Sequence, residues 1–141
     1  MASPENTFIG SVHRHLPKAL YRIKNHNQYN GGIADVWYSG KLDLWVEYKF
    51  IKVPVRDDTV IDLIHGTVKT GPDISNLQQE WLKSRHAEGR NVGVIVGSEK
   101  GGVWYPGTTW NRTSTSLEFR AAILPRPALA VLILRLLGAG K

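Results

Sequence analysis

The chain has 141 residues, of which 18 are lysine or arginine, 12 are aspartate or glutamate and none is cysteine. This length predicts a single domain over residues 1–141, and the lack of cysteine excludes disulfides and thiolate metal sites and favours an intracellular protein. The net charge of +6 suits a polyanionic partner, although a basic protein without such a partner would show the same balance. The sequence contains no P-loop, GxSxG motif, Cys/His zinc spacing or internal repeat.

A first helix is predicted to begin at Ser3, because this capping hydroxyl is followed by Pro4 at the first helical position and by Glu5 in the first turn. We expect the helix to run to about Leu16, ahead of Pro17. Its apolar face would contain Phe8, Ile9, Val12 and Leu16. Glu5 lies on the same inward stripe, so it is either an acid matched to the helix dipole or a carboxylate of a metal site.

A basic band is expected on the outer face of this helix, made of His13, Arg14, His15 and Lys18. The band suits either plain solvation or contact with phosphate groups. It does not suit a metal site, because no cysteine or nearby acid accompanies the histidines. Residues 19–24 predict a first strand, and residues 25–32 a polar loop.

The stretch 31–50 predicts a β-hairpin with a short, turn-rich connection at residues 38–41. Period-two alternation divides the side chains of its second strand between two faces. One face carries Glu47 and Lys49, and the other carries Leu44, Val46 and Tyr48.

Folding of this hairpin would bring Asp35, on the first apolar run, close to Glu47 on the second strand. Two carboxylates and a nearby backbone carbonyl are ligands that suit Mg²⁺ or Mn²⁺. Lys49 would face the metal. The same three residues also occur in ordinary hairpins, in which the acids only neutralise the lysine.

The following segment, residues 50–74, gives no firm secondary-structure prediction. Its glycines, lone histidine and lysines suit a loop over a substrate groove, and equally a plain surface excursion.

A second helix is predicted from Ser75, which forms a capping box with Gln78, to a stop at Gly89. The apolar face of this helix would contain Leu77, Trp81 and Leu82. By propensity alone, Gln78 is only a cap residue.

Residues 91–96 predict a buried strand, and Gly101 and Gly102 a turn into an edge strand at 103–105. The tryptophans of this part, including Trp110, suit core or edge packing better than base stacking.

The C-terminal run 127–137 is apolar all round except for Arg135. It is shorter than the roughly 20 residues that span a bilayer. The run is therefore either a fully buried helix or one covered by a partner chain, and we expect a homodimer.

The combination of Asp35, the Glu47-x-Lys49 pair, the helix motif Ser75-x-x-Gln78 and Gly89 resembles the PD-(D/E)XK nuclease superfamily. Within it, the pattern is similar to the virus-type replication-repair nuclease (VRR-NUC) branch and to Holliday junction resolvases. Ala34 stands where the superfamily usually has proline, and the segment before Ser75 is longer than in a minimal member. The resemblance implies, in agreement with the order of elements, an α/β restriction-endonuclease-like fold with a central mixed β-sheet flanked by helices.

The resemblance also implies roles for particular residues. The catalytic residues would be Asp35, Glu47, Lys49 and Gln78, and the metal ligands Glu5, Asp35, Glu47 and the carbonyl of Tyr48. The nucleic-acid contacts would come from Arg14, Lys18, Lys52 and Lys69.

The function implied is a Mg²⁺- or Mn²⁺-dependent, structure-selective endonuclease that cuts branched DNA such as Holliday junctions. We expect it in the cytoplasm of a bacterium or of a phage-infected host cell. Two alternatives share the fold: a nucleic-acid-binding domain without catalysis, whose acids pair with Lys49, and an exonuclease with the same site.

Overall fold

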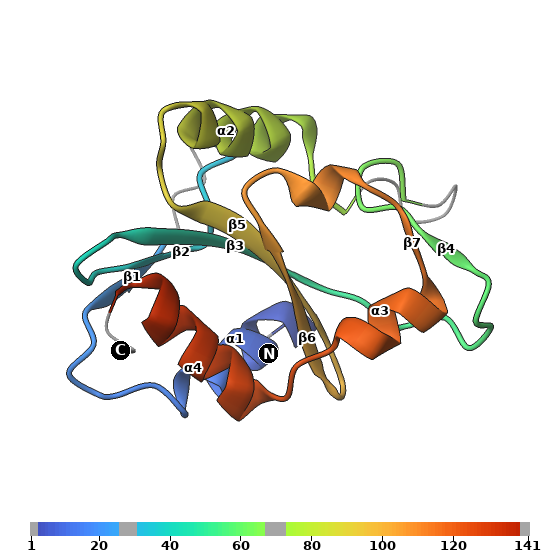
Figure 1. Ribbon diagram of the computed structural model, residues 1–141, viewed down its shortest axis with the longest axis horizontal. Helices are drawn as coiled ribbons and strands as arrows, with labels where there is room; N and C mark the ends of the chain where they lie inside the picture. Colours follow the sequence, from blue (N-terminus) through green and yellow to red (C-terminus); the bar gives the residue numbers. More distant parts are fainter. Residues whose placement is uncertain (1–2, 26–30, 67–72, 139–141) are drawn as a thin grey trace.

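A mixed sheet of five strands forms the centre of the computed structural model, which describes residues 3–25, 31–66 and 73–138. The elements are, in chain order, α1 (Pro4–His13), β1 (Arg22–Lys24), β2 (Val36–Tyr38), β3 (Leu44–Phe50), β4 (Val60–Ile61), α2 (Asn76–Ala87), β5 (Val92–Ser98), β6 (Gly101–Pro106), the short 3-10 helix η1 (Thr109–Asn111), β7 (Ser114–Thr115), α3 (Ser116–Ala122) and α4 (Arg126–Leu136) (Figure 1).

The strand order of the sheet is β1-β2-β3-β5-β6. Strands β3 and β5 pair in parallel, and every other neighbouring pair in this sheet is antiparallel. The crossover between β3 and β5 contains α2, as parallel pairing requires. Strands β4 and β7 form a separate antiparallel pair beside α3. The predicted mixed sheet flanked by helices is confirmed.

Helices cover the two faces of the sheet unequally. Helices α1 and α4 lie on one face, below the sheet in Figure 1, and α2 lies on the other. The α1/α4 face contains a large apolar cluster, whose buried members include Phe8, Ile9, Val36, Val46, Tyr48, Leu129 and Ile133. The α2 face has a second cluster, which includes Leu82, Val92, Val94, Trp110 and Phe119. Because Trp110 is fully buried, it packs in the core and does not stack on bases.

The first helix begins as predicted and ends three residues early. The Ser3 hydroxyl accepts a hydrogen bond from the backbone N–H of Asn6 at 3.1 Å. The helix ends at His13 and not near Leu16, since Pro17 disfavours helical backbone in the residue before it. The assignment of His13 to an outer basic band is wrong, because its Nε2 lies 2.7 Å from the hydroxyl of the buried Tyr38.

Three other boundaries differ from the prediction. Strand β1 is limited to three residues, and β2 begins after Asp35 instead of including it. Gly101 and Gly102 belong to β6, and the turn lies at residues 99–100. Close packing explains both glycines: a Cβ on Gly101 would lie 2.1 Å from the Leu124 carbonyl oxygen, and one on Gly102 would lie 3.0 Å from the Phe8 ring.

Helix α4 packs with one side against α1 and β6. Its Leu129, Ala130 and Ile133 are buried, whereas Val131 is 51% exposed. On α2, Leu82 is buried as expected, but Leu77 is 60% exposed and does not belong to the apolar face. In the part of the chain that the structure describes, no helix has the length and hydropathy needed to span a membrane.

Candidate metal centre

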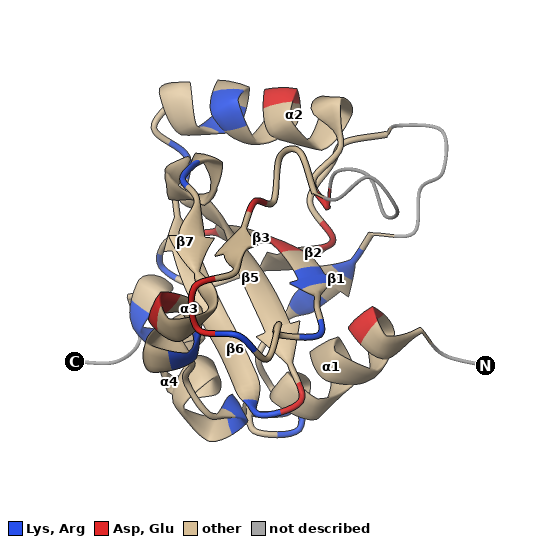
Figure 2. Cartoon of the chain, turned by 90° about the vertical axis from the view of Figure 1, so that its right-hand side faces the viewer, with Lys and Arg blue, Asp and Glu red and all other residues tan. Residues whose placement is uncertain are grey.

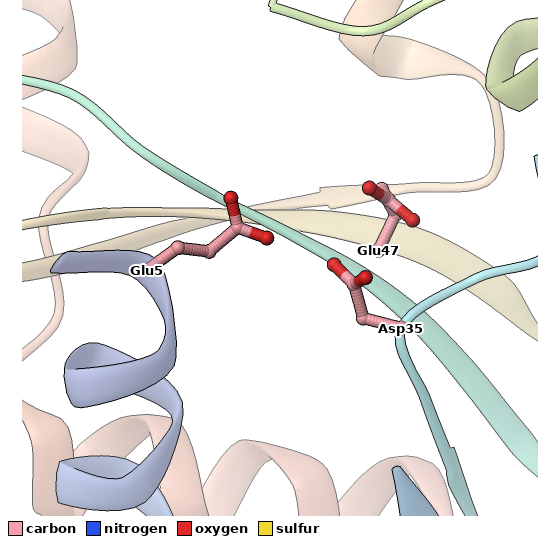
Figure 3. A group of neighbouring side chains, drawn as sticks. All are labelled: Glu5, Asp35 and Glu47. Atoms are coloured by element: carbon pink, nitrogen blue, oxygen red, sulfur yellow. The ribbon is translucent and has the colours of Figure 1, made fainter. Parts of the chain in front are cut away.

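Three carboxylates from different parts of the chain converge at one point. Glu5, Asp35 and Glu47 each place a carboxylate oxygen so that these oxygens all lie within 4.8 Å of one another (Figure 3). Glu5 comes from the first turn of α1, Asp35 from the residue before β2, and Glu47 from the middle of β3. The structure therefore brings together the three acidic residues that the sequence singled out.

Strand pairing and one main-chain hydrogen bond position Asp35. Val36 pairs with Val46 in the antiparallel β2–β3 register. Asp35, one residue earlier, therefore lies beside Glu47 and Tyr48 of β3. The backbone N–H of Tyr48 donates to Asp35 Oδ2 at 2.9 Å. The N–H and C=O of one residue leave a strand on the same side, so the Tyr48 carbonyl faces this side as well.

Glu47 is a buried carboxylate with only part of its hydrogen-bonding capacity used. Its side chain is 1% exposed, and its Oε2 accepts from Gln78 Nε2 at 2.9 Å and lies 3.3 Å from Lys49 Nζ. Glu47 Oε1 has no hydrogen-bond partner among the described residues. Burial, and then the charge of Asp35, raise the pKa of Glu47 to about 9 against the opposing effect of Lys49.

The pKa of Glu5 is raised to about 7, first by burial and then by Asp35, while Lys49 and Lys24 act against this rise. An excess of negative charge in a partly desolvated space produces these shifts. A divalent cation would relieve it, and oxygen is the ligand atom that Mg²⁺ and Mn²⁺ prefer. The donor set and the unpaired oxygen of Glu47 therefore fit such a cation.

Gln78 caps α2 and also contacts the carboxylate cluster. Its Oε1 accepts from the backbone N–H of Ser75 at 2.9 Å, which completes the capping box. Its Nε2 donates to Glu47, so the same amide ties the start of α2 to the carboxylate cluster. Lys49, next to Glu47, is 16% exposed and remains open to a ligand at the cluster.

The cations proposed for nucleic-acid contact lie in different places. Arg14, Lys18 and Lys52 are exposed, and Lys69 lies outside the described residues. Arg14 follows the end of α1, about 13 Å along the helix from Glu5, so it is remote from the cluster. Lys24 was not singled out from the sequence, but it donates to Asn6 Oδ1 at 2.6 Å and lowers the pKa of Glu5. Figure 2 shows in blue the basic residues of β1, the edge strand of the sheet.

A chain of three polar side chains, also missed from the sequence, lies behind the cluster. The Tyr38 hydroxyl is 2.7 Å from His13 Nε2 and 2.6 Å from the Tyr48 hydroxyl. Burial, followed by the charges of Arg22 and Lys24, lowers the pKa of His13 to about 4. At neutral pH the ring is uncharged, and these side chains join the end of α1 to β2, which follows Asp35, and to β3, which contains Glu47. The linked residues lie 25 and 10 positions apart in the sequence, so no local pattern indicated this network.

No protein-family model matches this sequence, and no curated protein matches it. Among solved structures, the chain is similar to Hjc from Archaeoglobus fulgidus, a Holliday junction resolvase from an archaeal hyperthermophile. The two share 16% sequence identity, the match covers 91% of this chain and 96% of that chain, and the TM-score is 0.55. At this identity the likeness shows the fold, and it confirms the predicted restriction-endonuclease-like class.

Proposed function

We propose that this protein is a metal-dependent, structure-selective DNA endonuclease that hydrolyses phosphodiester bonds in branched DNA such as Holliday junctions. The observation that carries the proposal is the convergence of Glu5, Asp35 and Glu47 beside Lys49, in a chain with the fold of a junction resolvase. The VRR-NUC branch remains our prediction for its place within the PD-(D/E)XK nucleases.

In this proposal Glu5, Asp35, Glu47 and the Tyr48 carbonyl hold Mg²⁺ or Mn²⁺. The ion would polarise the scissile phosphate and lower the pKa of the attacking water. Asp35, which accepts a hydrogen bond from the Tyr48 N–H, would bind the ion directly. Glu5 lies in the first turn of α1 and would bind directly or through a water.

In this proposal Lys49 would act on the reacting phosphate directly, and Gln78 would act through Glu47. The Lys49 ammonium, held 3.3 Å from Glu47, would turn to the attacking water or to the charge that develops on the phosphate oxygens. Gln78 orients the Glu47 carboxylate through its 2.9 Å hydrogen bond. Because both side chains contact Glu47, loss of either should also disturb the carboxylate.

The wider basic surface would supply affinity without sequence selection. Lys24 and Lys52 are the cations we propose near the path of the DNA, and Arg14 and Lys18 would contact phosphates farther away. Lys69 remains a predicted nucleic-acid contact. The net charge of +6 includes the three acids of the cluster, so the rest of the surface is more basic still.

We further propose that α4 is the interface of a two-fold homodimer. Val131 is half exposed on a helix that is otherwise apolar apart from its two arginines and Pro127. Leu132 and Leu136 pack against the core of their own chain, so Val131 is the cleaner test position. Light scattering at micromolar concentration should give a dimer mass for the wild type and a monomer mass for Val131→Asp. A wild-type monomer would contradict the interface.

One observation favours a rival function. The ion pair between Glu47 and Lys49 is what a binding domain without catalysis would use to neutralise a buried acid. An exonuclease, in contrast, would share the whole site and differ only in how it admits a DNA end.

The test is incubation of the protein with labelled four-way junction, flap, duplex and single-stranded DNA in Mg²⁺, Mn²⁺ or EDTA. The proposal predicts cleavage of branched DNA that requires metal and gives discrete internal products. Binding without cleavage in any metal would support the binding domain, and a ladder of terminal products would support the exonuclease.

A further inference from the structure

A row of aromatic rings crosses the α2 side of the sheet next to the carboxylate cluster. The ring centroids of Tyr21 and Trp37 lie 5.7 Å apart, those of Trp37 and Trp45 6.1 Å, and those of Trp45 and Trp81 5.4 Å. The row thus runs from the residue before β1, across β2 and β3, to α2. We call these four residues the aromatic row.

Strand β3 and helix α2 each contribute residues both to the aromatic row and to the carboxylate cluster or its contacts. On each element, these residues lie on the same face. On β3, Trp45 and Glu47 are two positions apart and point to the same face, about 7 Å from each other along the strand. On α2, Gln78 and Trp81 are three positions apart and both reach down to β3. A DNA strand whose phosphate lies at Glu47 would therefore have its neighbouring nucleotides over the row.

The row remains accessible, and its α2 end is basic. Tyr21 is 60% exposed, and the three tryptophans are half-buried. Beyond Trp81, the Arg85 guanidinium lies over the indole at 5.6 Å from its centroid. A cavity of about 290 Å³ opens here, lined by Trp45, Trp81, Arg85, Glu88 and Arg90. Both arginines pair with the single acid of the cavity, since Arg85 Nε lies 3.0 Å and Arg90 Nε 3.8 Å from Glu88 Oε1. The cavity lining therefore keeps an excess of one positive charge, which favours a phosphate group.

Helix packing alone accounts for only part of this arrangement. The contact of Trp81 with Trp45 holds α2 on the sheet, and any helix in this place would need such a contact. Tyr21, however, is far from fully buried, and its ring contact is with Trp37 and not with the helix. An exposed aromatic side chain at the end of a continuous row is the arrangement that binds stacked bases.

We infer that the aromatic row binds unpaired DNA bases by stacking, next to the phosphate that is cut. This inference rests on the proposed function and names the part of a branched substrate that the site selects: bases freed from pairing at the branch. Stacking on aromatic side chains contributes about 1–3 kcal/mol per base and does not depend on base identity. Arg85 and Arg90 would hold the phosphates that accompany those bases.

The experiment measures binding in EDTA, so that it does not depend on cleavage. Fluorescence anisotropy gives the affinity of the full-length protein for a labelled oligothymidine and for a fully paired duplex of the same length. Tyr21→Leu tests the exposed end of the row, where a change leaves the core intact. Trp81→Leu keeps an apolar contact with Trp45 but removes the large indole face, and Trp81→Phe restores an aromatic ring. Trp104→Leu is the control, because Trp104 is also half-buried but packs on the α1/α4 face.

We expect Tyr21→Leu and Trp81→Leu each to weaken oligothymidine binding about fivefold or more, with duplex binding nearly unchanged. Trp81→Phe should recover most of the affinity, and Trp104→Leu should match the wild type. Equal losses for both DNAs, or no loss in Tyr21→Leu with folded protein by circular dichroism, would overturn the inference.

These results separate the stacking inference from the proposed activity. A wild type that cuts junctions, while Tyr21→Leu binds oligothymidine normally, would overturn only the stacking inference. Selective loss of oligothymidine binding in a protein that never cuts DNA would overturn only the proposed activity.

Discussion

Strand β3 presents two unlike faces. Toward α1 and α4 it directs Leu44, Val46 and Tyr48, which are all fully buried. Toward α2 it directs Trp45, Glu47 and Lys49, which form part of the aromatic row and of the carboxylate cluster. One strand thus supports an apolar core on one side and a charged site on the other.

The difference shows how this small protein separates stability from function. Burial of an apolar side chain stabilises the fold, whereas burial of a carboxylate without a matching cation destabilises it. The raised pKa of Glu47 is the sign of that destabilisation. We therefore expect substitutions on the two faces to have opposite consequences for stability and activity.

The largest effect should follow from removing charge on the α2 face. Asp35→Asn, Glu47→Gln and Lys49→Ala should each reduce junction cleavage at least about 10²–10³-fold, because each removes a group that acts on the reacting phosphate or its metal. DNA affinity in EDTA should be largely retained. Asp43→Asn, an exposed acid in the same hairpin, is the control and should keep wild-type rates. Retained cleavage in Glu47→Gln would refute the site assignment.

On the α1/α4 face, Ile133→Ala should instead lower the free energy of unfolding by about 2–5 kcal/mol, because Ile133 is fully buried. Val131→Ala, on the same helix, should change it by less than about 0.5 kcal/mol at a protein concentration low enough to dissociate the proposed dimer, because Val131 is half exposed within its own chain. Urea unfolding measures both. Similar losses in the two variants would mean that α4 is covered on all sides.

Residues on the two helices that approach the cluster should have intermediate effects. Glu5→Gln and Gln78→Ala should slow cleavage about 10–100-fold, since each supports the site without being its central ligand. Ser75→Ala separates the two roles of Gln78: it removes the cap, at about 1 kcal/mol of stability, but leaves the hydrogen bond from Gln78 to Glu47. Equal slowing of cleavage in Ser75→Ala and Gln78→Ala would mean that Gln78 acts only as a helix cap.

The smallest effect concerns pH and stability in the protein without metal. The pKa of Glu47 is about 9 when folded and 4.5 ordinarily, so between these values the folded state retains a proton that the unfolded chain has lost. Stability should therefore fall as the pH rises through this window, and the pKa of about 7 for Glu5 adds to the slope.

At pH 8 in EDTA, Glu47→Gln should be more stable than the wild type by about 1 kcal/mol, or roughly 4 °C in Tm. Mg²⁺ should raise the Tm of the wild type and not that of the variant. A wild-type Tm that does not change from pH 5 to pH 8.5 would show that Glu47 is better solvated than its position implies.

Local sequence patterns predicted the parts of this structure that depend on neighbouring residues. The Ser3 cap, the Ser75–Gln78 capping box and the β2–β3 hairpin follow from short-range rules, and each is confirmed. The predicted hairpin was sufficient to place Asp35 close to Glu47. The placement of Glu5 beside them needed the family resemblance, because no local rule fixes a helix against a sheet.

Contacts between distant residues could not be predicted in this way. His13 was assigned to solvent because helical periodicity places it off the apolar stripe, but a tyrosine 25 positions away supplies a buried hydrogen-bond partner. The glycines of β6 suggested a turn, whereas close approach by the backbone of Leu124 to Gly101 and by the Phe8 ring to Gly102 is the reason for them. The aromatic row likewise joins four segments, so no single stretch of sequence reveals it.

The central claim is that the acids on the α2 side of β3 hold a divalent cation. Calorimetric titration of Mn²⁺ into metal-free protein at pH 8 tests it most directly, without DNA or cleavage. The account predicts saturable binding to the wild type and to Asp43→Asn, and its loss in both Asp35→Asn and Glu47→Gln. Binding that is equally strong in all four proteins, or absent from the wild type, would contradict it.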